Sequence, residues 1–148
     1  MGLILFDTNI LVYAHDSADP VRQARAITAL DHVHATGQGR LSTQVLAEFF
    51  CTVTGSRRPL LAPADAARQA DRLLRSWHVL EVTHLIVAEA LRGVLTHRLA
   101  YWDSQLWASA RLNQVPVVFS EDFSTGAVLE GVRFVNPLED GFDAGAWA

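Results

Sequence analysis

Five short runs of strand character, four of them mainly apolar, are separated by longer segments of helical periodicity in this 148-residue chain. The first run, at residues 2–6, is apolar on both faces, as a buried strand of a parallel sheet is. The other runs lie at residues 40–43, 79–82, 115–119 and 132–135. Helical spacing between the runs predicts helices at about 10–15, 20–35, 43–54, 64–77, 83–95 and 100–113. Strands separated by helices predict an α/β domain with a mainly parallel sheet and right-handed crossovers.

Length and composition predict one compact domain, which we place at residues 1–138, followed by a tail at 139–148 that has no periodic pattern. The net charge is −4 and every basic residue is an arginine, so the chain is not a polycation that coats nucleic acid. Asp7 interrupts the opening apolar stretch and no basic segment precedes it. We therefore expect a cytoplasmic protein without a signal peptide or membrane contact. The lone Cys51 lies among apolar residues, which predicts a buried thiol.

Two acidic positions directly follow strongly apolar predicted strands. Asp7 ends the first run, and Glu121 and Asp122 follow the run at 115–119 with Ser120 between. Ligands of open α/β sheets bind outside the carboxyl ends of the strands, so both positions fall on the expected functional edge. Each also has an ordinary structural explanation, because Asp7 suits a turn or a helix cap and an acid pair is common in loops.

Two more acids lie on predicted helices. Asp103 falls inside the apolar arc centred near Leu99 and Leu106, where a solvated acid is not expected, although it also suits the cap of a helix beginning at Ser104. Glu48 lies roughly 130° from the apolar face of its helix, which by itself favours ordinary solvent exposure.

These four acids can converge on one edge of a parallel sheet, and like charges gathered together need a cation. Oxygen ligands without a histidine–cysteine cluster favour a hard ion, Mg²⁺ or Mn²⁺. Zinc is disfavoured because the six histidines are scattered along the chain.

Four segments, in this order and spacing, resemble the PIN domain, and in particular the VapC-like toxin ribonucleases of type II toxin–antitoxin systems. They are "FDTNILVYA" (6–14), "STQVLAEFF" (42–50), "YWDSQLWASA" (101–110) and "VVFSEDF" (117–123). The resemblance covers nearly the whole chain. It implies a three-layer α/β/α fold around a central, mainly parallel sheet of about five strands.

The resemblance also implies the site. Its catalytic and metal-binding acids would be Asp7, Glu48, Asp103 and Asp122, with Glu121 as the alternative to Asp122. The groups that would orient these acids or bound waters are Thr8, Asn9 and Ser120. The implied activity is a Mg²⁺- or Mn²⁺-dependent endoribonuclease that hydrolyses RNA phosphodiesters in line.

A cognate antitoxin and a homodimer are the protein partners that the resemblance implies. Arginines of a predicted loop and of one helical stripe are candidate contacts to RNA or antitoxin, although a solvated helix face is the better explanation: Arg57, Arg58, Arg68, Arg72 and Arg75. The alternatives are a PIN-type binding or autoregulatory partner with little activity and a housekeeping PIN nuclease. A phosphatase of the haloacid dehalogenase type is disfavoured, because it requires a second aspartate where this chain has Asn9.

Overall fold

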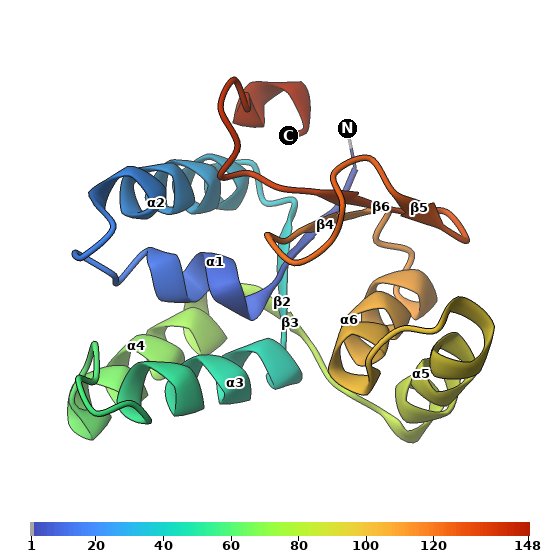
Figure 1. Cartoon of the computed structure of the whole chain (residues 1–148), viewed down its shortest axis with the longest axis horizontal. Helices are drawn as coiled ribbons and strands as arrows, with labels where there is room; N and C mark the ends of the chain where they lie inside the picture. Colours follow the sequence, from blue (N-terminus) through green and yellow to red (C-terminus); the bar gives the residue numbers. More distant parts are fainter. Residues whose placement is uncertain (1) are drawn as a thin grey trace.

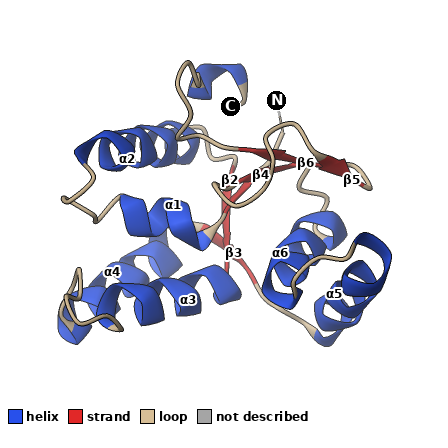
Figure 2. Ribbon diagram, viewed as in Figure 1, coloured by secondary structure: helices blue, strands red, loops and turns tan. Residues whose placement is uncertain are grey.

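The computed structural model describes residues 2–148 and contains helices on both faces of one sheet (Figures 1 and 2). Helices α1 to α4 lie on one side, and α5 and α6 on the other. The strands are β1 (Ile4–Phe6), β2 (Gly39–Ser42), β3 (His78–Leu80), β4 (Val117–Phe119), β5 (Val128–Leu129) and β6 (Val132–Val135). The helices are α1 (Thr8–Tyr13), α2 (Pro20–Ala35), α3 (Thr43–Thr54), α4 (Pro63–Ser76), α5 (His84–His97), α6 (Tyr101–Leu112) and the short 3₁₀ helix η1 (Ala144–Ala146).

The sheet has six strands in the order β3-β2-β1-β4-β6-β5. Every pairing is parallel except that of β5 with β6, a short antiparallel hairpin at the edge. The predicted α/β class and mainly parallel sheet are therefore confirmed. The sixth strand, β5, is only two residues long and had no apolar run of its own by which to predict it.

Strands β1 and β4 form the centre of the sheet and bring two chain segments together. All three residues of β1 are fully buried, and Phe6 is aligned with Phe119 in β4. The two phenylalanine rings meet edge to face with their centroids 5.3 Å apart. Just beyond them, the backbone N–H of Asp7 donates to the Phe119 carbonyl at 2.9 Å. The residues that follow β1 and β4 consequently emerge side by side.

The first residues of helices α1, α3 and α6 determine where the acids lie relative to these strands. The Asp7 side chain caps α1 by accepting from the Thr8 N–H at 2.7 Å, and Ser42 caps α3 by accepting from the Val45 N–H. Helix α6 begins at Tyr101, so Asp103 lies within its first turn. The alternative that Asp103 caps a helix beginning at Ser104 is therefore wrong.

Several side chains differ from their predicted burial. Val21 and Ile27 have the helical spacing of a buried face, yet they are exposed on α2, which buries other residues between 26 and 33. Cys51 is also exposed, since α3 turns it away from the buried Phe49.

The carboxyl-terminal segment, predicted to follow the domain as a tail, packs against the sheet and α2. Phe142 and Trp147 each place a ring edge against Phe119, with centroids 5.3 and 6.4 Å apart. The Arg25 side chain on α2 donates to the Leu138 carbonyl at 2.6 Å. Within residues 2–148, no helix has both the length and the apolar character needed to cross a bilayer.

Gly93 sets how closely α5 approaches α6 and is expected to tolerate no larger residue. A Cβ atom at this position would overlap Ser104 Oγ and lie 2.7 Å from the Trp107 ring. Both neighbours are buried, so overpacking should cost about 1–3 kcal/mol of unfolding free energy in Gly93→Ala. Urea denaturation measures this cost. Leu95→Ala on the exposed side of α5 is the matched control and should change stability little. If Gly93→Ala were as stable as Leu95→Ala, α5 and α6 could move apart without cost.

Candidate active site

A hollow of about 390 Å³ opens where α1, α3, α6 and the β4–β5 loop meet. Of the thirteen described residues that line it, six carry carboxylates and none is basic. We call it the acidic hollow; its lining residues are Asp7, Thr8, Asn9, Val12, Tyr13, Asp16, Gln44, Glu48, Thr52, Trp102, Asp103, Glu121 and Asp122. All four acids predicted from the sequence lie in it, although they come from four separate segments.

Asp7 is the most buried acid in the hollow, with 9% of its surface exposed. Its two carboxylate oxygens accept from the Thr8 N–H and the Ser120 hydroxyl, each at 2.7 Å. Burial raises the pKa of Asp7 from 3.8 to about 6, the hydrogen bonds from Ser120 and Thr8 lower it in part, and the charges of Asp122 and Glu48 raise it further. The protein thus holds a carboxylate where its negative charge is poorly solvated.

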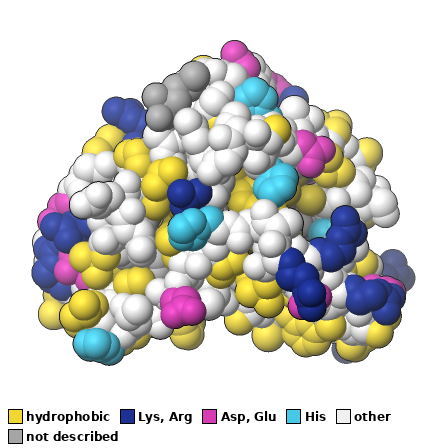
Figure 3. Space-filling model, turned by 180° about the vertical axis from the view of Figure 1, so that it is seen from behind, with side chains coloured by type: hydrophobic (Ala, Val, Ile, Leu, Met, Phe, Trp, Pro, Cys, Tyr) yellow, Lys and Arg dark blue, Asp and Glu magenta, His cyan; other side chains and the backbone are white. Residues whose placement is uncertain are grey.

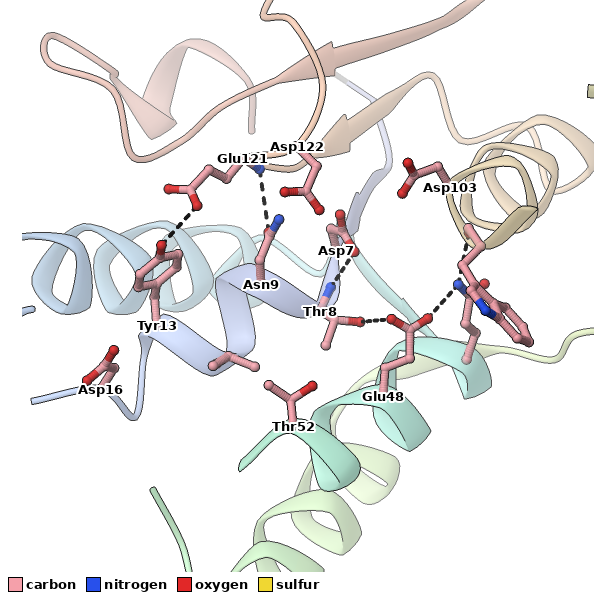
Figure 4. A pocket seen from close by; sticks show the side chains of 13 residues that line it. Asp7, Thr8, Asn9, Tyr13, Asp16, Glu48, Thr52, Asp103, Glu121 and Asp122 are labelled. Atoms are coloured by element: carbon pink, nitrogen blue, oxygen red, sulfur yellow. Dashed lines mark hydrogen bonds between the residues drawn. The ribbon is translucent and has the colours of Figure 1, made fainter. Parts of the chain in front are cut away.

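Asp103 enters the hollow from the first turn of α6, on the other side of the sheet (Figure 4). Its pKa is raised by burial first and then by the charges of Asp122 and Glu48. Its carboxylate therefore faces negative neighbours, and within residues 2–148 it forms no ion pair with a cationic side chain. Asp103 is half-buried, so the apolar arc around it in the sequence indicated its partial removal from solvent.

Glu48 is half-buried on α3, which corrects the expectation of ordinary solvent exposure. Its two oxygens accept from Gln44 Nε2 at 2.6 Å and from the Thr8 hydroxyl at 3.5 Å. The reason for the difference is that α1 packs across α3, which turns an otherwise open helix face into a wall of the hollow.

Asp122 and Glu121 point in different directions. Figure 4 shows the Asp122 carboxylate directed toward Asp7, whereas Glu121 turns to Tyr13. Glu121 accepts from the Tyr13 hydroxyl at 2.9 Å and from Arg22 Nε at 3.1 Å. Because Glu121 already has two partners, Asp122 is the better placed fourth acid.

The predicted supporting residues contact the acids. The Ser120 hydroxyl donates to Asp7 and accepts from the Asp122 N–H at 3.1 Å, so one side chain links the ends of β1 and β4. Asn9 Oδ1 accepts from the Glu121 N–H, but Asn9 Nδ2 is buried without a hydrogen-bond partner in the part of the chain described. That donor is free to bind an acceptor that enters the hollow.

A divalent cation fits the chemistry of the acidic hollow. Its donors are carboxylate, amide and hydroxyl oxygens, which hard ions such as Mg²⁺ and Mn²⁺ prefer, and it offers neither thiolate nor imidazole. Within residues 2–148, no three acidic, histidine or cysteine side chains are gathered as tightly as the ligands of one ion. Carboxylates whose charges raise the pKa of Asp7 and Asp103 are the expected arrangement of such a site before a cation draws them together.

None of the five arginines proposed from the sequence as RNA or antitoxin contacts lines the acidic hollow. Arg57 and Arg58 are exposed in the α3–α4 loop, and Arg68, Arg72 and Arg75 are exposed on α4. Arg68 pairs with Asp65, and Arg75 pairs with Asp71 at 2.8 Å. In the view from behind, the α4 side of the molecule carries this basic cluster at the lower right (Figure 3).

Six of the residues that line the hollow were not predicted from the sequence, Asp16, Gln44 and Trp102 among them. Asp16 accepts from the Ala18 N–H at 3.0 Å at the rim, as an aspartate in a turn does. Gln44 and Trp102 carry no charge and so gave no signal of an unusual position. Trp102 also fitted the apolar face of its helix, yet its surface is 62% exposed.

The model of the PIN domain family matches residues 4–125, a span that contains all the acids described above. No curated protein sequence matches the chain significantly.

Solved structures share the fold over most of their length. A toxin–antitoxin complex from Klebsiella pneumoniae aligns with a TM-score of 0.65 and 18% identity, covering 90% of this chain and 97% of the other. VapC20 from Mycobacterium tuberculosis, described as a sarcin–ricin loop cleaving toxin, aligns with a TM-score of 0.62 and 24% identity, covering 88% and 98%. A DNA-bound VapBC from Salmonella typhimurium aligns with a TM-score of 0.64 and 14% identity, covering 93% and 99%.

Proposed function

Because the chain belongs to the PIN domain family, we propose that it is a nuclease that uses Mg²⁺ or Mn²⁺ to hydrolyse RNA phosphodiesters, and that it is the toxin of a toxin–antitoxin pair. The observation that carries the proposal is the convergence of Asp7, Glu48, Asp103 and Asp122 on one hollow whose described lining residues include no basic side chain. A scissile phosphate cannot approach these charges unless a cation neutralises them.

The proposal gives the residues distinct tasks. Asp7, Asp103 and Asp122 would hold the cation, with Glu48 binding it directly or through water. When bound, the cation would activate a water and polarise the phosphate. Ser120 and Thr8 keep Asp7 oriented through their hydrogen bonds, and Gln44 does the same for Glu48. The free Asn9 Nδ2 can donate to a phosphate oxygen that enters the hollow.

The direct test incubates the purified protein with a structured RNA that has single-stranded loops, in Mn²⁺ and in EDTA. We expect cleavage in Mn²⁺ alone. Cleavage of equal rate in EDTA would refute the metal-dependent mechanism, and no cleavage of any RNA in either condition would favour the alternative of a PIN-type binding partner with little activity.

The neighbouring carboxylates Glu121 and Asp122 supply a matched pair of variants. Asp122→Asn removes a charge directed at Asp7, so we expect RNA cleavage to fall more than about 10-fold. Glu121→Gln keeps an acceptor for Tyr13 and should retain cleavage within a few-fold. Initial cleavage rates of the two variants at one Mn²⁺ concentration show which carboxylate takes part in the reaction. If Glu121→Gln were the slower variant, Glu121 would be the fourth acid.

Support for an antitoxin partner comes from the solved structures with this fold, several of which are toxin–antitoxin complexes. An adjacent reading frame for a small DNA-binding protein, whose product copurifies with this chain and suppresses its RNA cleavage, would support the toxin assignment. An isolated gene would instead favour a housekeeping PIN nuclease. The predicted homodimer is tested by sedimentation velocity of the purified chain.

A further inference from the structure

Trp102 is a large aromatic side chain that folding leaves outside the core. Its surface is 62% exposed, whereas Trp107, one turn further along α6, is fully buried. Exposed tryptophan at a protein surface is typical of binding sites, because the ring offers a wide apolar face without a charge. Trp102 directly precedes Asp103, one of the acids proposed to hold the cation.

A second hollow adjoins the acidic hollow at Trp102. This side groove has a volume of about 490 Å³ and is lined by Thr43, Gln44, Ala47, Glu48, Cys51, Val82, Trp102 and Gln105. Three of these residues, Gln44, Glu48 and Trp102, also line the acidic hollow, so the two are continuous. A chain whose phosphate lies at the carboxylates can therefore extend directly into the side groove.

A chain of hydrogen bonds holds the backbone of Trp102, and one aromatic contact holds its ring. The Tyr101 hydroxyl donates to Gln105 at 2.8 Å, Gln105 Nε2 donates to Gln44 at 3.0 Å, and Gln44 Nε2 donates to the Trp102 carbonyl at 3.0 Å. The Tyr101 ring also meets the Trp102 ring edge on, with centroids 5.0 Å apart. An aromatic surface held in this way binds a flat partner without first having to be ordered.

Neither hollow offers a positively charged side chain among its described lining residues. Proteins that grip nucleic acid without sequence preference combine basic grooves with aromatic stacking, and the basic part is missing here. Binding energy for a nucleic acid strand at this position must then come from the cation and from stacking. The wide neutral ring of Trp102 suits the face of a nucleobase.

We propose that Trp102 is the stacking platform for one unpaired base of the RNA strand, next to the phosphate that is cleaved. The inference rests on the proposed function and adds to it a side chain that positions the RNA strand. The base must be unpaired and able to unstack from its neighbours, so the site would select single-stranded or loop RNA over a continuous duplex.

The test measures RNA affinity without cleavage, in the Asp7→Asn background with Mg²⁺. Fluorescence anisotropy of a labelled single-stranded RNA should show about 5- to 100-fold weaker binding when Trp102→Ala is added, because one stacked base is lost. Trp102→Phe should restore most of the affinity. Leu95→Ala, at an 84% exposed apolar position on α5, should leave it unchanged.

A scan of single abasic sites along the same RNA separates stacking from a general structural effect. At one position along the RNA, removal of the base should weaken binding to the protein that retains Trp102. The same abasic RNA should bind the Trp102→Ala variant no more weakly than the intact RNA does. RNA should also slow the alkylation of Cys51, the only cysteine of the chain, which lines the side groove.

Three results would overturn the inference in distinguishable ways. RNA binding that Trp102→Ala leaves unchanged would refute the stacking site alone. If that variant instead lost affinity for a cognate antitoxin peptide, the side groove would belong to the protein partner. No RNA binding by the Asp7→Asn protein, together with no cleavage by the unmodified chain, would refute the proposed function as well.

Discussion

Replacing Asp103 by asparagine is expected to slow RNA cleavage by more than about 100-fold, since loss of a residue that merely supports a metal ligand already costs about 10- to 100-fold. The substitution keeps the size of the side chain and removes one charge from the acidic hollow. Burial and the charges of Asp122 and Glu48 raise the pKa of Asp103, so the fold gains nothing from this ionised carboxylate. We therefore attribute the expected loss of RNA cleavage in Asp103→Asn to its role in the site and not to a weakened fold.

Initial cleavage rates at saturating Mn²⁺ measure the effect, and far-UV circular dichroism checks the fold. Asp140→Asn is the matched control because Asp140 is almost fully exposed and lies outside the acidic hollow. We expect the control to cleave RNA at the rate of the unmodified chain. If Asp103→Asn did the same, Asp103 would have no part in cation binding.

Asp7→Asn is expected to be inactive and yet to stabilise the metal-free protein. The pKa of Asp7 is about 6 in the folded chain against 3.8 in the unfolded chain. The folded state therefore binds this proton more tightly. The stability that protonation of Asp7 contributes to the folded state is fully present below about pH 4 and is lost as the pH rises through about 6. At pH 7.5 the buried charge should cost about 2–3 kcal/mol, which asparagine avoids.

Urea denaturation in EDTA at pH 4 and pH 7.5 measures this difference. Asp7→Asn should be more stable than the unmodified chain at pH 7.5 and nearly equal to it at pH 4. Adding Mn²⁺ at pH 7.5 should stabilise the unmodified chain more than the variant, which keeps Asp103 and Asp122 but lacks one of the proposed cation ligands. An Asp7→Asn protein that is less stable at pH 7.5 would mean that the Asp7 carboxylate, with its bonds from Ser120 and Thr8, is needed by the fold itself.

Much of the fold could be predicted because its signals are local. The fully apolar residues 4–6 and 117–119 predict central strands, and Thr83 predicts the start of α5 that it caps. The exposed side of α2 could not be predicted in this way, because Val21 and Ile27 fit the helical spacing as well as buried residues do. Which apolar residues reach the core depends on how α2 packs against its neighbours, which the helical spacing alone does not specify.

The acids of the site were predictable to different degrees. Asp7 and Asp103 stand out in sequence because each interrupts an apolar pattern. Glu48 does not, since only the packing of α1 across α3 removes it from open solvent. The choice between Asp122 and Glu121 depends on Tyr13 and Arg22, which are distant in the chain and engage Glu121. Trp102 gave no signal because its exposure follows from how α6 packs.

Direct titration of Mn²⁺ into the metal-free protein at pH 7.5, followed by calorimetry, tests whether the acidic hollow is a cation site. We expect saturable binding to the unmodified chain and to Asp140→Asn, and loss of that binding in Asp7→Asn combined with Asp103→Asn. Undiminished Mn²⁺ affinity in the double variant would show that any cation binds elsewhere and that these carboxylates do not form the metal site of a nuclease.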